Sequence, residues 1–111
     1  MMKLLLLVAV WSVTVVPQVF AKENEEAAIV SAAETYLRAN ATVTTKVKFV
    51  VEQVDGDFAR VRINPEDKAA ADTAWIFLKK KDGKWTGLTV GTSFTVEDYQ
   101  QLGIPNGLRI P

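Results

Sequence analysis

The chain offers few side chains that could carry out catalysis. Its 111 residues include neither histidine nor cysteine. Ser-His-Asp and Cys-His catalysis depend on these residue types, and so do zinc sites built on nitrogen or sulfur ligands. The sequence also lacks a glycine-rich loop of the P-loop or dinucleotide-binding form. These kinds of site are excluded, and we expect no cofactor and no metal.

Two aspartates flank a glycine where an oxygen-rich site could form. Asp55 and Asp57 lie on either side of Gly56, and calcium prefers oxygen ligands. A calcium loop would need further acidic residues at the positions of Ala59 and Arg60. Asp-Gly is also a strong hairpin sequence, because glycine accepts a positive φ without steric cost. We therefore interpret this segment as a turn.

Three consecutive residues, Glu97, Asp98 and Tyr99, could do acid–base chemistry if they were buried in a pocket. They follow Thr95, and a threonine ahead of acidic residues is typical of a helix N-terminus with solvated carboxylates. We therefore favour a non-catalytic protein and keep a pocket enzyme as an alternative.

Four lysines, Lys79, Lys80, Lys81 and Lys84, surround a second Asp-Gly sequence. A basic patch could bind nucleic acid or lipid, but the chain has 13 basic and 13 acidic residues and so no global field to attract either. Lysines near strand ends commonly protect a sheet edge from aggregation. We expect that protective role, and no nucleic-acid partner.

The N-terminus has the pattern of a cleaved signal peptide, residues 1–21. Lys3 is followed by an apolar run over residues 4–16, shorter than the roughly 20 residues that a membrane-spanning helix needs. Pro17 ends the run, and Ala21 provides the small residue ahead of a cleavage site at Lys22. We expect a secreted or periplasmic protein without a stable membrane anchor, consisting of one domain over residues 22–111.

One amphipathic helix opens this domain. Its apolar positions recur at helical spacing: Ile29, Ala32, Ala33, Tyr36 and Leu37. Asn24 is the predicted N-cap, and Asn40 is the predicted C-terminal residue in a left-handed conformation.

Four strands and a short helix follow. Alternating apolar residues and Asp-Gly turns predict strands over residues 46–52, 58–63, 73–81 and 84–91. Thr95 opens the short helix, and Gly103 closes it. The predicted fold class is α+β: one N-terminal helix packed on a four-stranded antiparallel meander, with a short C-terminal helix and tail.

The third predicted strand is apolar on both sides. Alternation places Ala74, Ile76 and Leu78 on one face and Trp75 and Phe77 on the other, and a single helix covers only one face. We expect Phe58 and Trp85 to add to the face of Trp75, which makes Phe58, Trp75, Phe77 and Trp85 the candidate binding residues.

Something must cover this second face, because a large exposed apolar patch is unusual on a soluble monomer. The cover is the C-terminal segment, a second copy in a homodimer formed through the sheet, or a small apolar ligand or partner protein. Residues 94–110 contain enough apolar side chains to fold back, and we favour that cover.

Several segments resemble small bacterial exported proteins with a cystatin-like or NTF2-like α+β roll. They are residues 56–60, 77–85, 91–94 and 102–105. The resemblance implies a helix gripped by a curved antiparallel sheet and implies little about activity.

A sharper resemblance concerns one hairpin. Cystatins that inhibit papain-type proteases carry a Gln-x-Val-x-Gly hairpin, and Gln53, Val54, Asp55 and Gly56 follow Glu52 at the corresponding place. Trp85 resembles the tryptophan of the family's second hairpin, with Lys84 in place of the preceding proline. The leading Gln and the N-terminal glycine of those inhibitors have no match. The resemblance implies a cysteine-protease inhibitor as the alternative to our main interpretation, a non-catalytic exported binding protein of unknown partner.

Overall fold

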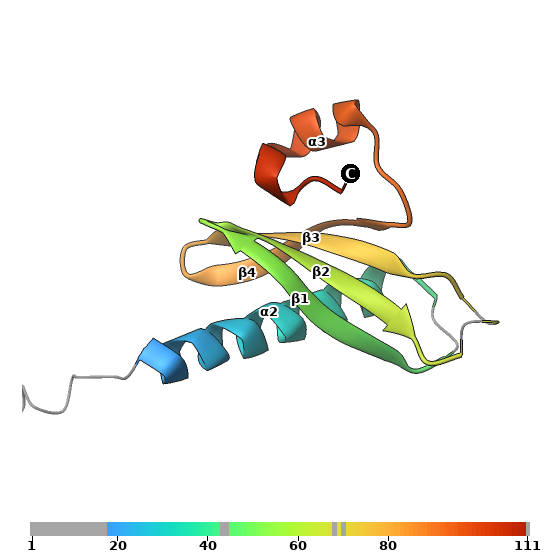
Figure 1. Ribbon diagram of the computed structural model, residues 1–111, viewed down its shortest axis with the longest axis horizontal. Helices are drawn as coiled ribbons and strands as arrows, with labels where there is room; N and C mark the ends of the chain where they lie inside the picture. Colours follow the sequence, from blue (N-terminus) through green and yellow to red (C-terminus); the bar gives the residue numbers. More distant parts are fainter. Residues whose placement is uncertain (1–17, 43–44, 68, 70, 111) are drawn as a thin grey trace, which may run out of the picture.

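The structure is a computed structural model that describes residues 18–42, 45–67, 69 and 71–110 (Figure 1). The elements follow in the order α2 (Gln18–Asn40), β1 (Val47–Asp55), β2 (Phe58–Pro65), β3 (Ala74–Lys81), β4 (Lys84–Gly91), α3 (Val96–Leu102) and the 3-10 helix η2 (Asn106–Leu108). The predicted α+β fold, with one long helix on a four-stranded antiparallel sheet and a short C-terminal helix, is confirmed.

The sheet is a meander with strand order β1-β2-β3-β4, and all neighbouring strands are antiparallel. Both predicted turns form, and Gly56 and Gly83 adopt positive φ angles of 60° and 79°. These angles are sterically open to glycine, which explains why the chain reverses at each Asp-Gly sequence. β1 and β4 are the two edge strands.

Helix α2 covers one face of the sheet with the predicted stripe. Ile29, Ala33 and Leu37 are buried against alternate residues of the strands. These strand residues are Ala59, Val61, Ile63, Ile76 and Leu78. A spacing of four residues places apolar side chains on one side of a helix, and a spacing of two places them on one face of a strand. The apolar side of α2 therefore packs on the apolar face of the sheet.

The ends of α2 differ in detail from the prediction. The helix begins at Gln18, ahead of Asn24, and no proline or glycine in residues 18–23 would interrupt it. It ends at Asn40 as expected, but without a left-handed residue there. Instead, the side-chain amide of Asn40 donates a hydrogen bond to the carbonyl of Tyr36 at 2.9 Å.

The predicted signal peptide falls mostly outside the described residues, which begin at residue 18. In the part of the chain that is described, no helix is both long and apolar enough to cross a membrane.

A bulge in β4 decides where Trp85 lies. Gly87 pairs with Leu78 and Thr89 pairs with Phe77, so Leu88 is an extra residue in the ladder. An extra residue inverts the alternation of side chains beyond it. Trp85 therefore shares the helix-covered face of the sheet, where it is 7% exposed.

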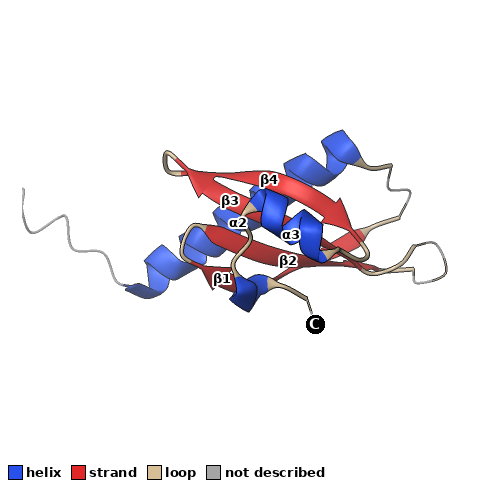
Figure 2. Ribbon diagram, turned by 90° about the horizontal axis from the view of Figure 1, so that it is seen from above, coloured by secondary structure: helices blue, strands red, loops and turns tan. Residues whose placement is uncertain are grey.

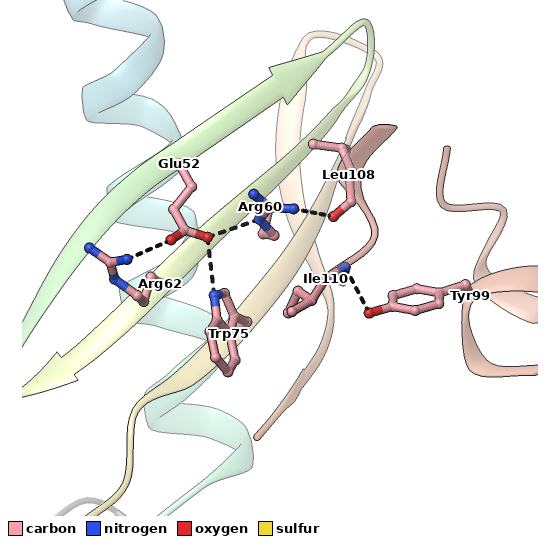
Figure 3. A network of polar contacts seen from close by, with 7 residues as sticks. All are labelled: Glu52, Arg60, Arg62, Trp75, Tyr99, Leu108 and Ile110. Carbon is pink, nitrogen blue, oxygen red and sulfur yellow. Dashed lines mark hydrogen bonds and ion pairs between the residues drawn. The ribbon is translucent and has the colours of Figure 1, made fainter. Parts of the chain in front are cut away.

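A second bulge, in β1, lies at Glu52. Val51 pairs with Val61 and Gln53 pairs with Arg60, which leaves Glu52 without a partner in the register. Its side chain reaches the face of the sheet away from α2, where Arg60 also lies (Figure 3).

The chain beyond β4 forms a third layer on that second face. Residues 94–110, named here the C-terminal cap, include α3 and η2 and lie on the opposite side of the sheet from α2 (Figures 1 and 2). Thr95 is the N-cap of α3, and a capping box links it to Asp98. Gly103 ends the helix at φ 68°. Both predicted ends of the short helix are confirmed.

Candidate binding surfaces

The alternation predicted for β3 is present in the structure. Ile76 and Leu78 belong to the core under α2, whereas Phe77 belongs to a separate core on the second face. Phe77 is 0% exposed. The second apolar face therefore exists, and the chain covers it with its own C-terminal cap.

The cover is built from aromatic rings. The ring of Phe77 makes edge-on contacts with Phe94 and Tyr99, with ring centroids 5.1 and 5.7 Å apart. Ile104 and Leu108 of the cap are buried in the same core. Edge-to-face pairs of this kind stabilise by about 0.5–1.5 kcal/mol beyond the burial of their area.

Next to these rings lies a polar network centred on Glu52 (Figure 3). Its Oε1 accepts hydrogen bonds from Arg60 Nε at 2.9 Å and from the indole Nε1 of Trp75 at 3.0 Å. Its Oε2 accepts one from Arg62 at 2.8 Å. The side chains of Glu52 and Arg60 are 18% and 16% exposed, so both ions are largely removed from water and depend on each other.

Sequence reasoning missed this network, although the sequence carries a signal for it. Arg60 and Arg62 alternate onto the face of Trp75, and two cations on a half-covered face need an acidic partner. Glu52 is the acidic residue of the neighbouring strand, and its alternation with Val51, which packs on the core under α2, already places it on this face.

The four predicted binding residues do not form one exposed patch. Phe77 is sealed by the cap, and Trp85 lies on the other side of the sheet, under α2. Phe58 is half-buried beside the cap, with Lys79 Nζ 5.3 Å from its ring centroid. Trp75 is half-buried and bonded to Glu52. The expectation for Trp85 is wrong, because the bulge in β4 changes its face.

The residues of the alternative hairpin, by contrast, are accessible. Gln53, Val54, Asp55 and Gly56 are all exposed, and Val54 retains 44% exposure although it is apolar. Glu52 is not part of this exposed set, because its side chain is engaged in the network.

The two hairpin turns lie side by side. Phe58, at the start of β2, pairs with Lys79, near the end of β3, so both turns are at one end of the sheet. The backbone N–H of Lys80 also donates to the carbonyl of Asp57 at 2.6 Å. The N-terminal part of α2 extends beyond the sheet at this same end (Figure 1). We name residues 53–57 and 81–84 the hairpin end.

The lysines at and beside the hairpin end have different environments. Lys80 Nζ is 3.1 Å from a carboxylate oxygen of Glu25 and 5.9 Å from the ring centroid of Trp85. Lys81 and Lys84 are exposed at the second turn, with Asp82 between them. The lysines therefore do not form a continuous free basic patch.

The residues proposed for acid–base or metal chemistry do not gather into a site. Asp98 accepts the N–H of Thr95 in the capping box, and the hydroxyl of Tyr99 accepts the N–H of Ile110 at 3.1 Å. Glu97 is exposed. Among the described residues, no group of three or more acidic residues is close enough to hold a metal ion.

Two open grooves flank α2 on the sheet side. One, of about 470 Å³, lies beside β1 and has apolar residues such as Leu37 and Phe49 together with charged Glu34 and Arg38, which pair with each other at 3.1 Å. The other, of about 800 Å³, lies beside β4 and is lined mainly by small residues of α2 with Tyr36 and Trp85. No carboxylate of the described residues lines this second groove.

In comparisons with known proteins, no family model, no curated protein and no solved structure matches the chain.

Proposed function

We propose that the protein is a non-catalytic exported binding protein that contacts a partner protein through its hairpin end. The observation that carries the proposal is the contrast in exposure. The second apolar face is closed by the cap, whereas Val54 stays 44% exposed in a row of exposed residues. Val54 and Val96 are the exposed large hydrophobic residues of the described chain.

The construction of the hairpin end favours binding. Pairing of β2 with β3 and the hydrogen bond from Lys80 N to Asp57 O hold its two turns next to each other, so the surface is preformed. A preformed surface loses less conformational entropy on binding than a flexible one. It combines an apolar side chain with exposed charges, as protein contact surfaces generally do.

A second candidate function is inhibition of a papain-type cysteine protease. The specific observation in its favour is that both turns and the N-terminal part of α2 lie at one end of the molecule (Figure 1). A protruding edge of this kind could enter a protease cleft. The charge of Asp55 at the first turn and the engagement of Glu52 in the network count against it.

The binding proposal can be tested with two matched variants. Val54→Asp and Val96→Asp each put a charge in place of an exposed valine, the first at the hairpin end and the second on α3. The purified protein and both variants are immobilised and exposed to the exported proteins of the source cells, and retained proteins are identified by mass spectrometry. We expect a protein that wild type and Val96→Asp retain and that Val54→Asp loses. Identical retention by all three would contradict the proposal.

The inhibitor function needs a separate test. Papain activity is titrated with the purified protein and with Val54→Asp. Stoichiometric inhibition that the variant loses would support it, and full protease activity at micromolar protein would exclude it for papain.

A further inference from the structure

The C-terminal cap is connected internally by its own hydrogen bonds. The capping box holds the start of α3, and Ile104 N donates to Tyr99 O at 3.0 Å. The Tyr99 hydroxyl accepts the N–H of Ile110 at 3.1 Å, and Arg109 Nε donates to Ile104 O at 3.3 Å. The guanidinium of Arg109 also lies 5.3 Å from the centroid of the Tyr99 ring. These bonds join the two ends of the cap to each other, independently of the sheet.

Apolar packing within this layer is also mostly internal. Of the residues that form or flank its core, only Phe58 and Phe77 come from the described part of the sheet. The others belong to the cap: Phe94, Tyr99, Leu102, Ile104, Leu108 and Ile110. The core around Phe77 is separate from the core under α2. Breaking the contact between cap and sheet would therefore leave the larger core intact.

Polar contact between the sheet and the cap comes from Arg60. Among the described residues, the one hydrogen bond that joins them runs from Arg60 Nη1 to the carbonyl of Leu108, at 2.6 Å (Figure 3). Glu52 holds the same guanidinium by its Nε at 2.9 Å. Glu52 thus positions Arg60, and Arg60 holds the cap.

From this arrangement we propose that the C-terminal cap is a latched lid, which Arg60 fastens under the control of Glu52 and which opens over Phe77 while the rest of the fold stays closed. Local opening of a segment with few attachments costs less free energy than global unfolding. This inference does not depend on the proposed partner contact of the hairpin end, although Gly107 of the cap lies beside Asp55 there.

The absence of cysteine from the chain makes a direct test possible. Ile104→Cys places a thiol in the cap, and Ile76→Cys places one under α2; the two isoleucines are 2% and 0% exposed. Labelling by a thiol reagent in the absence of denaturant reports how often each site opens. We expect the cap thiol to react at least about tenfold faster than the thiol under α2. Equal rates at the two sites would overturn the proposal, because cap and sheet would then open as one unit.

The latch itself is tested by adding Arg60→Lys to each of the two cysteine variants. Lysine keeps the charge but lacks the planar fork that serves Glu52 and Leu108 together. Loss of this charged hydrogen bond should accelerate labelling of the cap thiol by about tenfold or more. The thiol under α2 should accelerate by no more than that factor, because global unfolding breaks the same bond. Arg38→Gln, which breaks the exposed pair with Glu34, should change neither rate. Unchanged labelling of the cap thiol, or acceleration of the thiol under α2 alone, would contradict the latch.

Amide hydrogen exchange on the protein without cysteine substitutions controls for an effect of the thiol itself. Cap amides such as Leu108 N and Arg109 N should exchange faster than amides of β2 and β3. Exchange of cap and sheet at one common rate would again overturn the lid.

Discussion

Phe77 of β3 meets Tyr99 of α3 edge to face, with their ring planes at 84° and their centroids 5.7 Å apart. This contact joins the centre of the sheet to the C-terminal cap. It also explains how a sheet with two apolar faces stays closed on both sides although one long helix covers only one of them.

Removal of the Phe77 ring should destabilise the protein, because the cap packs on this ring. Phe77→Ala leaves a cavity in a fully buried site, and phenylalanine-to-alanine changes in cores cost about 3–5 kcal/mol of unfolding free energy. Urea denaturation followed by circular dichroism measures the loss. Val96→Ala, at a residue 58% exposed, should change stability by less than about 0.5 kcal/mol. A loss below about 1 kcal/mol for Phe77→Ala would show that the ring is not buried as described.

Glu52 should contribute more to stability than a surface carboxylate does. Glu52→Gln leaves Arg60 and Arg62 without their anionic partner in a half-covered site, and Arg62 Nε already has no hydrogen-bond partner among the described residues. In a completely buried network, this change would lower the unfolding free energy by about 3–5 kcal/mol. Because Arg62 is partly exposed, we expect a loss of about 1–3 kcal/mol.

Glu34→Gln provides the matched control for this change. Glu34 pairs with Arg38, but both side chains are largely exposed, and we expect a loss below about 0.5 kcal/mol in the same denaturation experiment. Equal effects of the two substitutions would argue that the Glu52 network is an ordinary surface cluster.

Gly87 should not tolerate even a methyl group. A Cβ atom there would overlap the side chain of Tyr36, whose ring packs on β4 and whose hydroxyl donates to Leu88 O at 3.2 Å. Gly87→Ala must displace the ring, and we expect a loss of about 1–3 kcal/mol, measured by thermal or urea unfolding.

Two further variants separate this clash from a general effect of alanine. Gly107→Ala places its Cβ at ordinary contact distance, 3.5 Å from Asp55 Oδ2, and should cost little. Tyr36→Ala combined with Gly87→Ala should cost less than the sum of the two single changes, because the ring that clashes is gone. Strict additivity would contradict a direct contact.

Gly103 should be sensitive for a different reason. A Cβ atom at this position would have no described neighbour within 4 Å, but the φ of 68° is left-handed. Gly103→Ala should therefore lower the unfolding free energy by about 1–2 kcal/mol, and Gly103→Asn by less, because asparagine enters this conformation more readily. An alanine variant as stable as wild type in urea would contradict this explanation.

The regular parts of the fold could be predicted because local pattern and tertiary contact agree. Ala59, Val61 and Ile63 alternate in the sequence and lie together under α2. Thr95 and Gly103 mark the ends of α3 by capping chemistry that depends on few neighbouring residues. The covering of Phe77 by residues 94–110 followed from the need to remove two apolar faces from water.

The irregular parts could not be predicted, because they depend on how the strands pair. The bulge at Leu88 inverts the alternation of β4 and carries Trp85 to the helix side. Glu52 lies at the second bulge, and the hydrogen bonds that join it to Arg60, Arg62 and Trp75 depend on the register of three strands. The bulge in β4 and the register around Glu52 are both set by pairing between strands, which the spacing of residues within one strand does not contain. For this reason the candidate surfaces were predicted less well than the fold.

The central claim is that Phe77 lies under the C-terminal cap, on the opposite side of the sheet from α2. Nuclear Overhauser contacts from the Phe77 ring protons of the purified protein test it most directly. The account predicts contacts to Tyr99 and Leu108 and none to Ile29 of the helix. Contacts from Phe77 to Ile29, or none to the cap, would contradict it.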